Sequence, residues 1–220
     1  MRHLVLPGKG VEPAKKVETD QSILFIGANG SGKTRLGTWI ELGRMQGSRI
    51  HRISAQKSLA MPDYTTPKSI ELAQRDLLFG NPNVENNVGA HRWGNRPATS
   101  LLNDFQKLMV YLFSDETEKN AKFKAACTQS AERLEPPRTK LDLLKDVWEA
   151  VLPHRELVIG GLQIETRVLD DNESIYKSSE MSDGERVMFY LIGQCLSIIC
   201  SQRNNRESPC LVISGARMRA

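Results

Sequence analysis

Residues 27 to 34 constrain this chain more than any other stretch, because they read Gly-Ala-Asn-Gly-Ser-Gly-Lys-Thr. They fit the pattern G-x-x-x-x-G-K-[ST], in which backbone N–H groups surround a phosphate. The preceding run at 23 to 26, Ile-Leu-Phe-Ile, is typical of a buried parallel strand. The run at 34 to 46 has apolar residues at helical spacing. The sequence therefore predicts a strand, a glycine-rich turn and a helix, which is the context in which this pattern binds phosphate.

Each residue type in this loop has a physical role. The glycines allow the backbone to bend without Cβ clashes, and the following helix adds the positive end of its dipole. Lys33 is expected to reach the outer phosphates, and the Thr34 hydroxyl to hold Mg²⁺. The alternative, a glycine-rich turn with a chance lysine, is less favoured because a strand and a helix are expected on either side. The predicted phosphate-binding residues are Gly27, Ala28, Asn29, Gly30, Ser31, Gly32, Lys33, Thr34 and Arg35.

Composition places the chain among ordinary globular proteins with one domain. It has 220 residues, of which 40% are hydrophobic and 25% are charged. The net charge of +4 comes from scattered basic residues, so it permits a nucleic-acid partner without indicating one. No apolar run is long enough to span a membrane, and the N-terminus does not resemble a signal peptide. The four cysteines lack C-x-x-C spacing, which favours reduced thiols in a cytoplasmic protein.

Residues 1 to 67 are expected to form a lobe around the phosphate loop, followed by a helical insertion at 68 to 152. Apolar stripes and turn residues set the expected elements. In the first lobe these are a strand at 3–6, a loop or irregular hairpin at 7–20, a helix ending near Gly47 and a strand at 49–55. In the insertion they are helices at 68–78, 99–113 and 139–152, an exposed helical extension at 115–135, and a loop at 79–97 pinned by Trp93. The Leu and aromatic stripes of the insertion are expected to be core.

Residues 153 to 213 are expected to hold a hairpin, a long apolar helix and a final strand. Gly160-Gly161 separates the strand-like runs 156–159 and 163–169, and a third short strand is expected at 175–177. The helix spans about 187 to 200, and the final strand is Cys210-Leu211-Val212-Ile213. Residues 214 to 220 read as an aberrant tail.

A second motif, Glu-Met-Ser-Asp-Gly-Glu-Arg at 180 to 186, precedes the long apolar helix. Ser182 and Glu185 have the spacing of a capping box, which alone would explain both residues. The motif also resembles the signature loop of ABC-type ATPases, Leu-Ser-Gly-Gly-Gln or Glu, with Ser182 and Gly184 matching. Asp183 stands where that pattern has its first glycine. The order of phosphate loop, helical lobe, hairpin and signature strengthens the match.

From about residue 23 to 213 the chain resembles ABC-type P-loop ATPases of the SMC, OLD and RecF-like group. It looks closest to stand-alone "AAA family" ATP-binding proteins of bacterial genomes and mobile elements, several tied to defence against phage. The resemblance implies an α/β P-loop NTPase sheet with a helical insertion lobe, and ATP with Mg²⁺ as ligands. It also implies an ATP-driven dimer in which Ser182 and Gly184 contact the nucleotide of the partner in trans. Gln56, with Arg52 and Ser54 nearby, would lie where a glutamine-bearing loop contacts Mg²⁺ and water.

The chain departs from this family after the final strand. There the family has Asp-Glu, which supports Mg²⁺ and the attacking water, but no acidic residue follows Ile213 here. We therefore expect no catalytic carboxylate, very slow hydrolysis, and a truncated product whose C-terminal strands are missing and whose sheet leaves an apolar edge exposed. A partner chain supplying the missing strands remains open.

Two other interpretations remain open. One is a non-catalytic module that uses ATP only to dimerise or to hold a partner. The other is a small P-loop kinase, for which Lys33 and Thr34 would serve equally well, although the 181 to 186 loop favours the ATPase resemblance.

Overall fold

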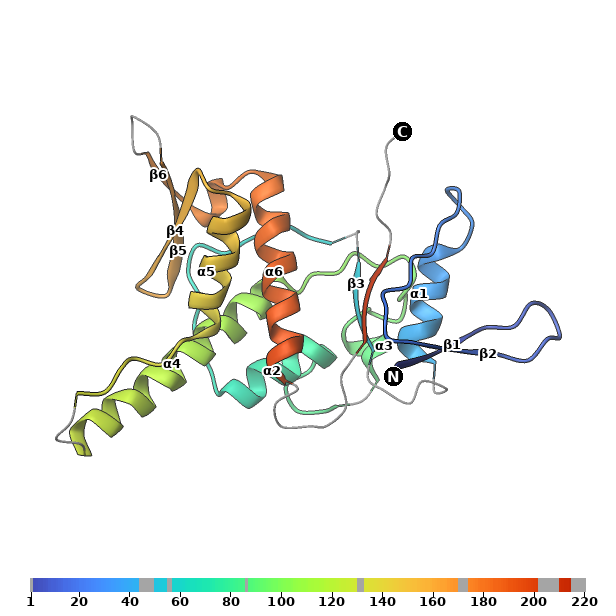
Figure 1. Cartoon of the computed structure of the whole chain (residues 1–220), viewed down its shortest axis with the longest axis horizontal. Coiled ribbons are helices and arrows are strands. Elements are labelled where there is room, and N and C mark those ends of the chain that lie inside the picture. Colours follow the sequence, from blue (N-terminus) through green and yellow to red (C-terminus); the bar gives the residue numbers. More distant parts are fainter. Residues whose placement is uncertain are drawn as a thin grey trace. The chain divides into compact units, whose positions relative to one another are not determined.

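The chain has a mixed α/β structure that divides into two compact units, described here from a computed structural model (Figure 1). The structure describes residues 2–43, 50–54, 57–85, 87–129, 133–169, 174–201 and 210–214. The first unit comprises 1–57, 87–102 and 198–220, and the second comprises 58–86 and 103–197. Within the described residues, no helix combines the length and the apolar character that crossing a membrane requires.

The first unit holds two small sheets and the helix that follows the phosphate loop. Strands β1 and β2 form an antiparallel hairpin, whereas β3 and β7 pair in parallel with Ile53 opposite Ile213. This confirms the predicted strands at 3–6, 49–55 and 210–213, and it decides for a hairpin at 7–20. The elements are β1 (Arg2–Leu6), β2 (Lys15–Thr19), α1 (Lys33–Leu42), β3 (Ile50–Ser54), α3 (Val88–His91) and β7 (Cys210–Ser214).

The predicted buried strand at 23 to 26 is wrong. These residues have no strand conformation, and the exposed fractions of the four side chains from Ile23 to Ile26 are 40%, 74%, 37% and 83%. A strand needs a neighbour for its backbone N–H and C=O groups. In the described part of the chain, β3 and β7 pair only with each other, so no ladder includes this apolar run.

Helix α1 also ends earlier than the sequence suggests. Its last residue is Leu42, and the N–H of Gly43 donates to the Trp39 carbonyl at 2.8 Å. The predicted end near Gly47 falls among residues 44–49, which lie outside the described residues. The sequence predicts a glycine as the C-cap, and Gly43 rather than Gly47 occupies this position.

The second unit contains four main helices and a three-stranded antiparallel sheet of order β4-β5-β6. The hairpin at Gly160-Gly161 and the short strand at 175–177 are as predicted. Helix α4 begins at Phe105 rather than Thr99, because Leu102 is instead buried in a bridge with Lys57 in the first unit. The elements are α2 (Ile70–Phe79), α4 (Phe105–Gln129), α5 (Lys140–Val151), β4 (Arg155–Gly160), β5 (Gln163–Val168), β6 (Ile175–Lys177), a 3₁₀ turn η1 (Ser178–Glu180) and most of α6 (Asp183–Ser201).

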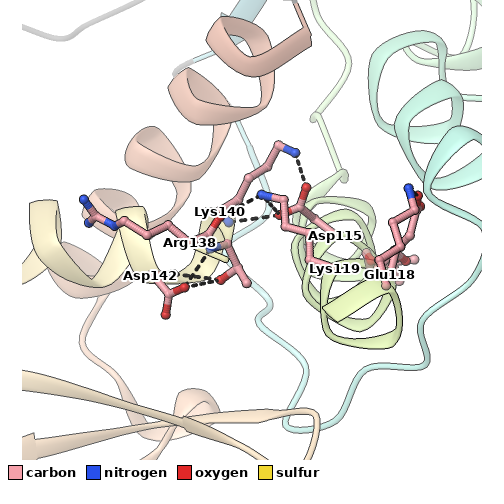
Figure 2. Close-up of polar contacts among 10 residues, drawn as sticks. Asp115, Glu118, Lys119, Arg138, Lys140 and Asp142 are labelled. Atoms are coloured by element: carbon pink, nitrogen blue, oxygen red, sulfur yellow. Dashed lines mark hydrogen bonds and ion pairs between the residues drawn. The ribbon is translucent and has the colours of Figure 1, made fainter. Parts of the chain in front are cut away.

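Most residues of the predicted helical stripes are buried in the core, but Leu101 and Val151, which the stripes include, are 62% and 47% exposed. The rings of Phe105 and Phe189 lie 6.0 Å apart, and Trp148 meets Phe189 edge-on at 6.3 Å. A Cβ added to Gly193 of α6 would lie 2.9 Å from a methyl of Leu108, so this glycine lets α6 approach α4 closely. Figure 2 shows a polar contact beside this core, where Asp115 of α4 lies between Lys119 and Lys140.

Candidate functional site: the phosphate loop and the N-terminus of helix α6

The loop at 27 to 32 turns into α1 through two glycines with left-handed backbone. Gly30 has φ 83° and Gly32, the N-cap of α1, has φ 89°. Side chains are strained in this region, which explains the glycines at both positions. A Cβ at Gly27 would lie 2.6 Å from the Ser31 hydroxyl oxygen, so a side chain here would force Ser31 to move. The local backbone therefore forms the turn that the motif predicts, although the strand before it is absent.

Lys33 lies across this loop. Its Nζ donates to the carbonyl oxygens of Gly27 at 2.6 Å and Ala28 at 2.9 Å. Both acceptors belong to the loop, and the side chain crosses five to six residues to reach them. The Lys33 side chain therefore folds back over the loop. Thr34 follows in the first turn of α1 and is half-buried.

The first turn of α1 contains no acidic side chain that could interact with the N-terminus of the helix. Its N-cap, Gly32, has no side chain to accept a hydrogen bond. Helices α5 and α6 differ, because Thr139 with Asp142 and Ser182 with Glu185 form capping boxes there. The first N–H groups of a helix need an acceptor. At α1 the motif leaves this role to a ligand or to water.

The capping box at Ser182 and Glu185 is confirmed. The Ser182 N–H donates to Glu185 Oε2 at 2.8 Å, and the Glu185 N–H donates to the Ser182 hydroxyl at 3.3 Å. Glu185 also accepts hydrogen bonds from the Tyr176 hydroxyl and from Arg155. It therefore fastens the start of α6 to the β4–β6 sheet.

Electrostatics keep the Glu185 carboxylate ionised. Burial opposes its charge, but hydrogen bonds from Tyr176, Ser182 and Arg155 outweigh burial and lower the pKa of Glu185 below its ordinary value. Burial and the hydrogen bond to Glu185 together raise the pKa of Tyr176 to about 12. Ser182 itself is exposed, and a Cβ added to Gly184 would meet nothing within 4 Å. The exposed residues at this helix start are Ser182, Asp183 and Gly184, of which Ser182 and Gly184 match the signature.

Of the other predicted residues, the structure gives Arg52 a different role from the expected one. Gln56 lies outside the described residues. Arg52 is not available to Mg²⁺ or nucleotide, because its buried guanidinium pairs with Glu41 at 2.9 Å and stacks 3.8 Å from the centre of the Trp93 ring. Ser182 and Gly184 belong to the second unit, and the loop belongs to the first. Among the described residues, no three His, Cys, Asp or Glu side chains gather as a metal site would require.

Sequence reasoning missed one feature beside the phosphate loop. Arg35, Thr38, Trp39 and Leu42 line a shallow hollow on α1, completed by Gly43 and Ala98. The spacing of the four α1 residues places them on one helix face, so the sequence held a signal for that face. The sequence held no signal for Ala98, because a contact between residues 60 positions apart depends on the tertiary fold.

The chain matches no protein-family model, no curated protein and no solved structure. The resemblance to ABC-type ATPases therefore rests on the motifs of this sequence alone.

Proposed function

We propose that the first unit binds a nucleoside triphosphate with Mg²⁺ at residues 27 to 35. The observation that carries this proposal is the combination of the glycine-shaped loop, the Lys33 ammonium held across it, and a helix start without any anion of its own. Positive φ values at Gly30 and Gly32 suit a backbone that wraps around phosphate. The Thr34 hydroxyl is the group expected to hold Mg²⁺.

The proposed activity is binding rather than efficient hydrolysis. Strand β7 reads Cys-Leu-Val-Ile-Ser and carries no carboxylate that could support Mg²⁺ or orient water. This favours a nucleotide-gated interaction module over an ATPase with ordinary turnover. By its resemblance to ABC-type ATPases, the chain would use ATP to bring together two copies.

Replacing Lys33 by alanine tests the phosphate site. A hydrogen bond to a charged group contributes about 1.5–3 kcal/mol, so we expect the affinity for Mg-ATP to fall about 10- to 100-fold. Isothermal titration calorimetry would measure this loss. The fold should persist, because the Lys33 ammonium contacts only loop carbonyls. Lys9→Ala, in the exposed β1–β2 turn, is the matched control and should bind as the unmodified chain does. Equal affinity of Lys33→Ala and the unmodified chain would refute the site.

Replacing Gly184 by leucine tests the role of the α6 start. The added side chain meets open space, so the free energy of unfolding should stay within about 1 kcal/mol or rise, since leucine favours helix over glycine. If Ser182 and Gly184 contact a partner's nucleotide, the bulky side chain should abolish dimerisation by Mg-ATP in sedimentation velocity. Gly160→Leu, another position with nothing within 4 Å, is the control and should still dimerise. A Gly184→Leu chain that dimerises normally would leave Ser182 only its capping role.

A further inference from the structure

The hollow on α1 begins one residue after the phosphate loop. It has a volume of about 370 Å³, and its surface is mostly apolar. Small-molecule sites are also lined mainly by apolar and aromatic side chains. The hollow is shallow and open to solvent, so it offers one wall to a ligand rather than an enclosing cleft, and its lining suits a flat, weakly polar group better than a phosphate.

Trp39 gives this hollow an aromatic wall. The chain has three tryptophans, of which Trp93 and Trp148 are 1% and 0% exposed, whereas Trp39 is only half-buried. A Cβ at Gly43 would lie 2.5 Å from the Trp39 carbonyl oxygen and 4.0 Å from its ring, so the glycine keeps a side chain from this spot. Of the three, Trp39 is thus the indole that a ligand can reach.

We propose that this hollow receives the ribose and base of the nucleotide whose phosphates occupy the loop, with Trp39 as the stacking surface. The inference rests on the proposed function and adds the nucleoside half of the site. Trp39 lies six positions after Lys33 on the helix, which is a rise of about 9 Å, so a ligand anchored at the first turn spans this length by extending along α1. Arg35 lies at the junction, beside both the phosphate loop and the hollow.

The residues that line the hollow suit any nucleobase and do not distinguish one base from another. Aromatic rings stack on any base, because every base presents a π-face. No Phe, Tyr or Trp precedes Phe25 in the sequence. Phe25 itself is 37% exposed and is the competing ring that a test must exclude.

The experiment compares Mg-ATP with inorganic triphosphate and Mg²⁺, using tryptophan fluorescence and calorimetry. Bound ATP should quench the fluorescence of the unmodified chain, and triphosphate should quench it much less. Trp39→Leu should weaken ATP binding about tenfold and leave triphosphate binding unchanged, which also shows that the variant is folded. Phe25→Leu, the matched aromatic control, should bind both ligands as the unmodified chain does.

Three outcomes would overturn the inference. They are ATP affinity unchanged in Trp39→Leu, equal quenching by the two ligands, and a loss confined to Phe25→Leu. In each of these cases triphosphate binding that depends on Lys33 would leave the proposed phosphate site standing. If neither ligand binds the unmodified chain, the proposed function fails together with the base subsite.

Discussion

Replacing Glu41 by alanine is expected to destabilise the first unit by about 3–5 kcal/mol. Glu41 lies on α1, and its side chain is only 2% exposed. One carboxylate oxygen accepts from Arg52 Nε at 2.9 Å and the other from Arg92 at 3.2 Å. Both guanidinium groups are as buried as the carboxylate. The truncation would leave two buried positive charges without their shared carboxylate, which is why the expected cost is large.

The surroundings of these arginines keep them from moving to water. Arg52 also donates to the Pro97 carbonyl at 2.6 Å, and Arg92 donates to the Arg52 carbonyl at 3.0 Å. Both guanidinium groups lie over the Trp93 ring, at 3.8 and 5.0 Å from its centre. The cluster thereby ties α1 and β3 to residues 92–97. Loss of Glu41 should loosen all three segments together.

Hydrogen exchange in increasing urea measures this effect unit by unit. Peptides covering α1 and β3 should lose protection at lower urea in Glu41→Ala, while peptides covering α5 in the second unit should not change. Glu85→Ala removes an exposed pair with Arg75 and is the control, with an expected effect below about 1 kcal/mol. Unchanged protection of α1 in Glu41→Ala would show that the buried charges are tolerated without their carboxylate.

Local patterns predicted the local elements of this chain well. The capping box at Ser182 needs only residues three positions apart, and it forms. The hairpin at Gly160-Gly161 depends on adjacent turn residues and alternating strands, and it also forms. The glycine-rich loop belongs to the same class, because its shape depends on glycines within six residues of one another.

Predictions that depended on distant partners fared less well. The apolar run at 23 to 26 has the composition of a buried strand, but strand formation requires a hydrogen-bonding neighbour that the run itself does not specify. Arg52 sits in a polar strand near the expected Mg²⁺ contact. Its actual partners, Glu41, Arg92 and Trp93, lie 11 to 41 positions away, so only the fold assigns it to a buried ion pair. The contribution of Ala98 to the hollow on α1 could not be predicted from the sequence either, because it also depends on a contact between distant positions.

Replacing Asp115 by alanine is expected to destabilise the second unit by about 3 kcal/mol. Its side chain is 6% exposed, and it accepts from the Lys140 backbone N–H at 3.0 Å while pairing with the Lys140 and Lys119 ammonium groups (Figure 2). These contacts join α4 to the first residue of α5. Asp146→Ala on α5, which removes an exposed pair with Arg138, is the matched control and should cost less than about 1 kcal/mol.

The pH dependence of the Asp115 effect is the sharper test. Burial alone would raise the pKa of Asp115, but the hydrogen bonds and charge of Lys140 outweigh burial and lower it below the ordinary 3.8. This contribution is present above pH 3.8 and is lost as the pH falls through the folded pKa.

Burial alone would lower the pKa of Lys140, whereas Tyr111 and Asp115 raise it above 10.5. That contribution is present below pH 10.5 and is lost as the pH rises through the folded pKa. The difference in the free energy of unfolding between the unmodified chain and Asp115→Ala should therefore be largest between these limits and shrink beyond both. Urea unfolding across the pH range measures it, and a difference independent of pH would mean that Asp115 acts through packing rather than charge.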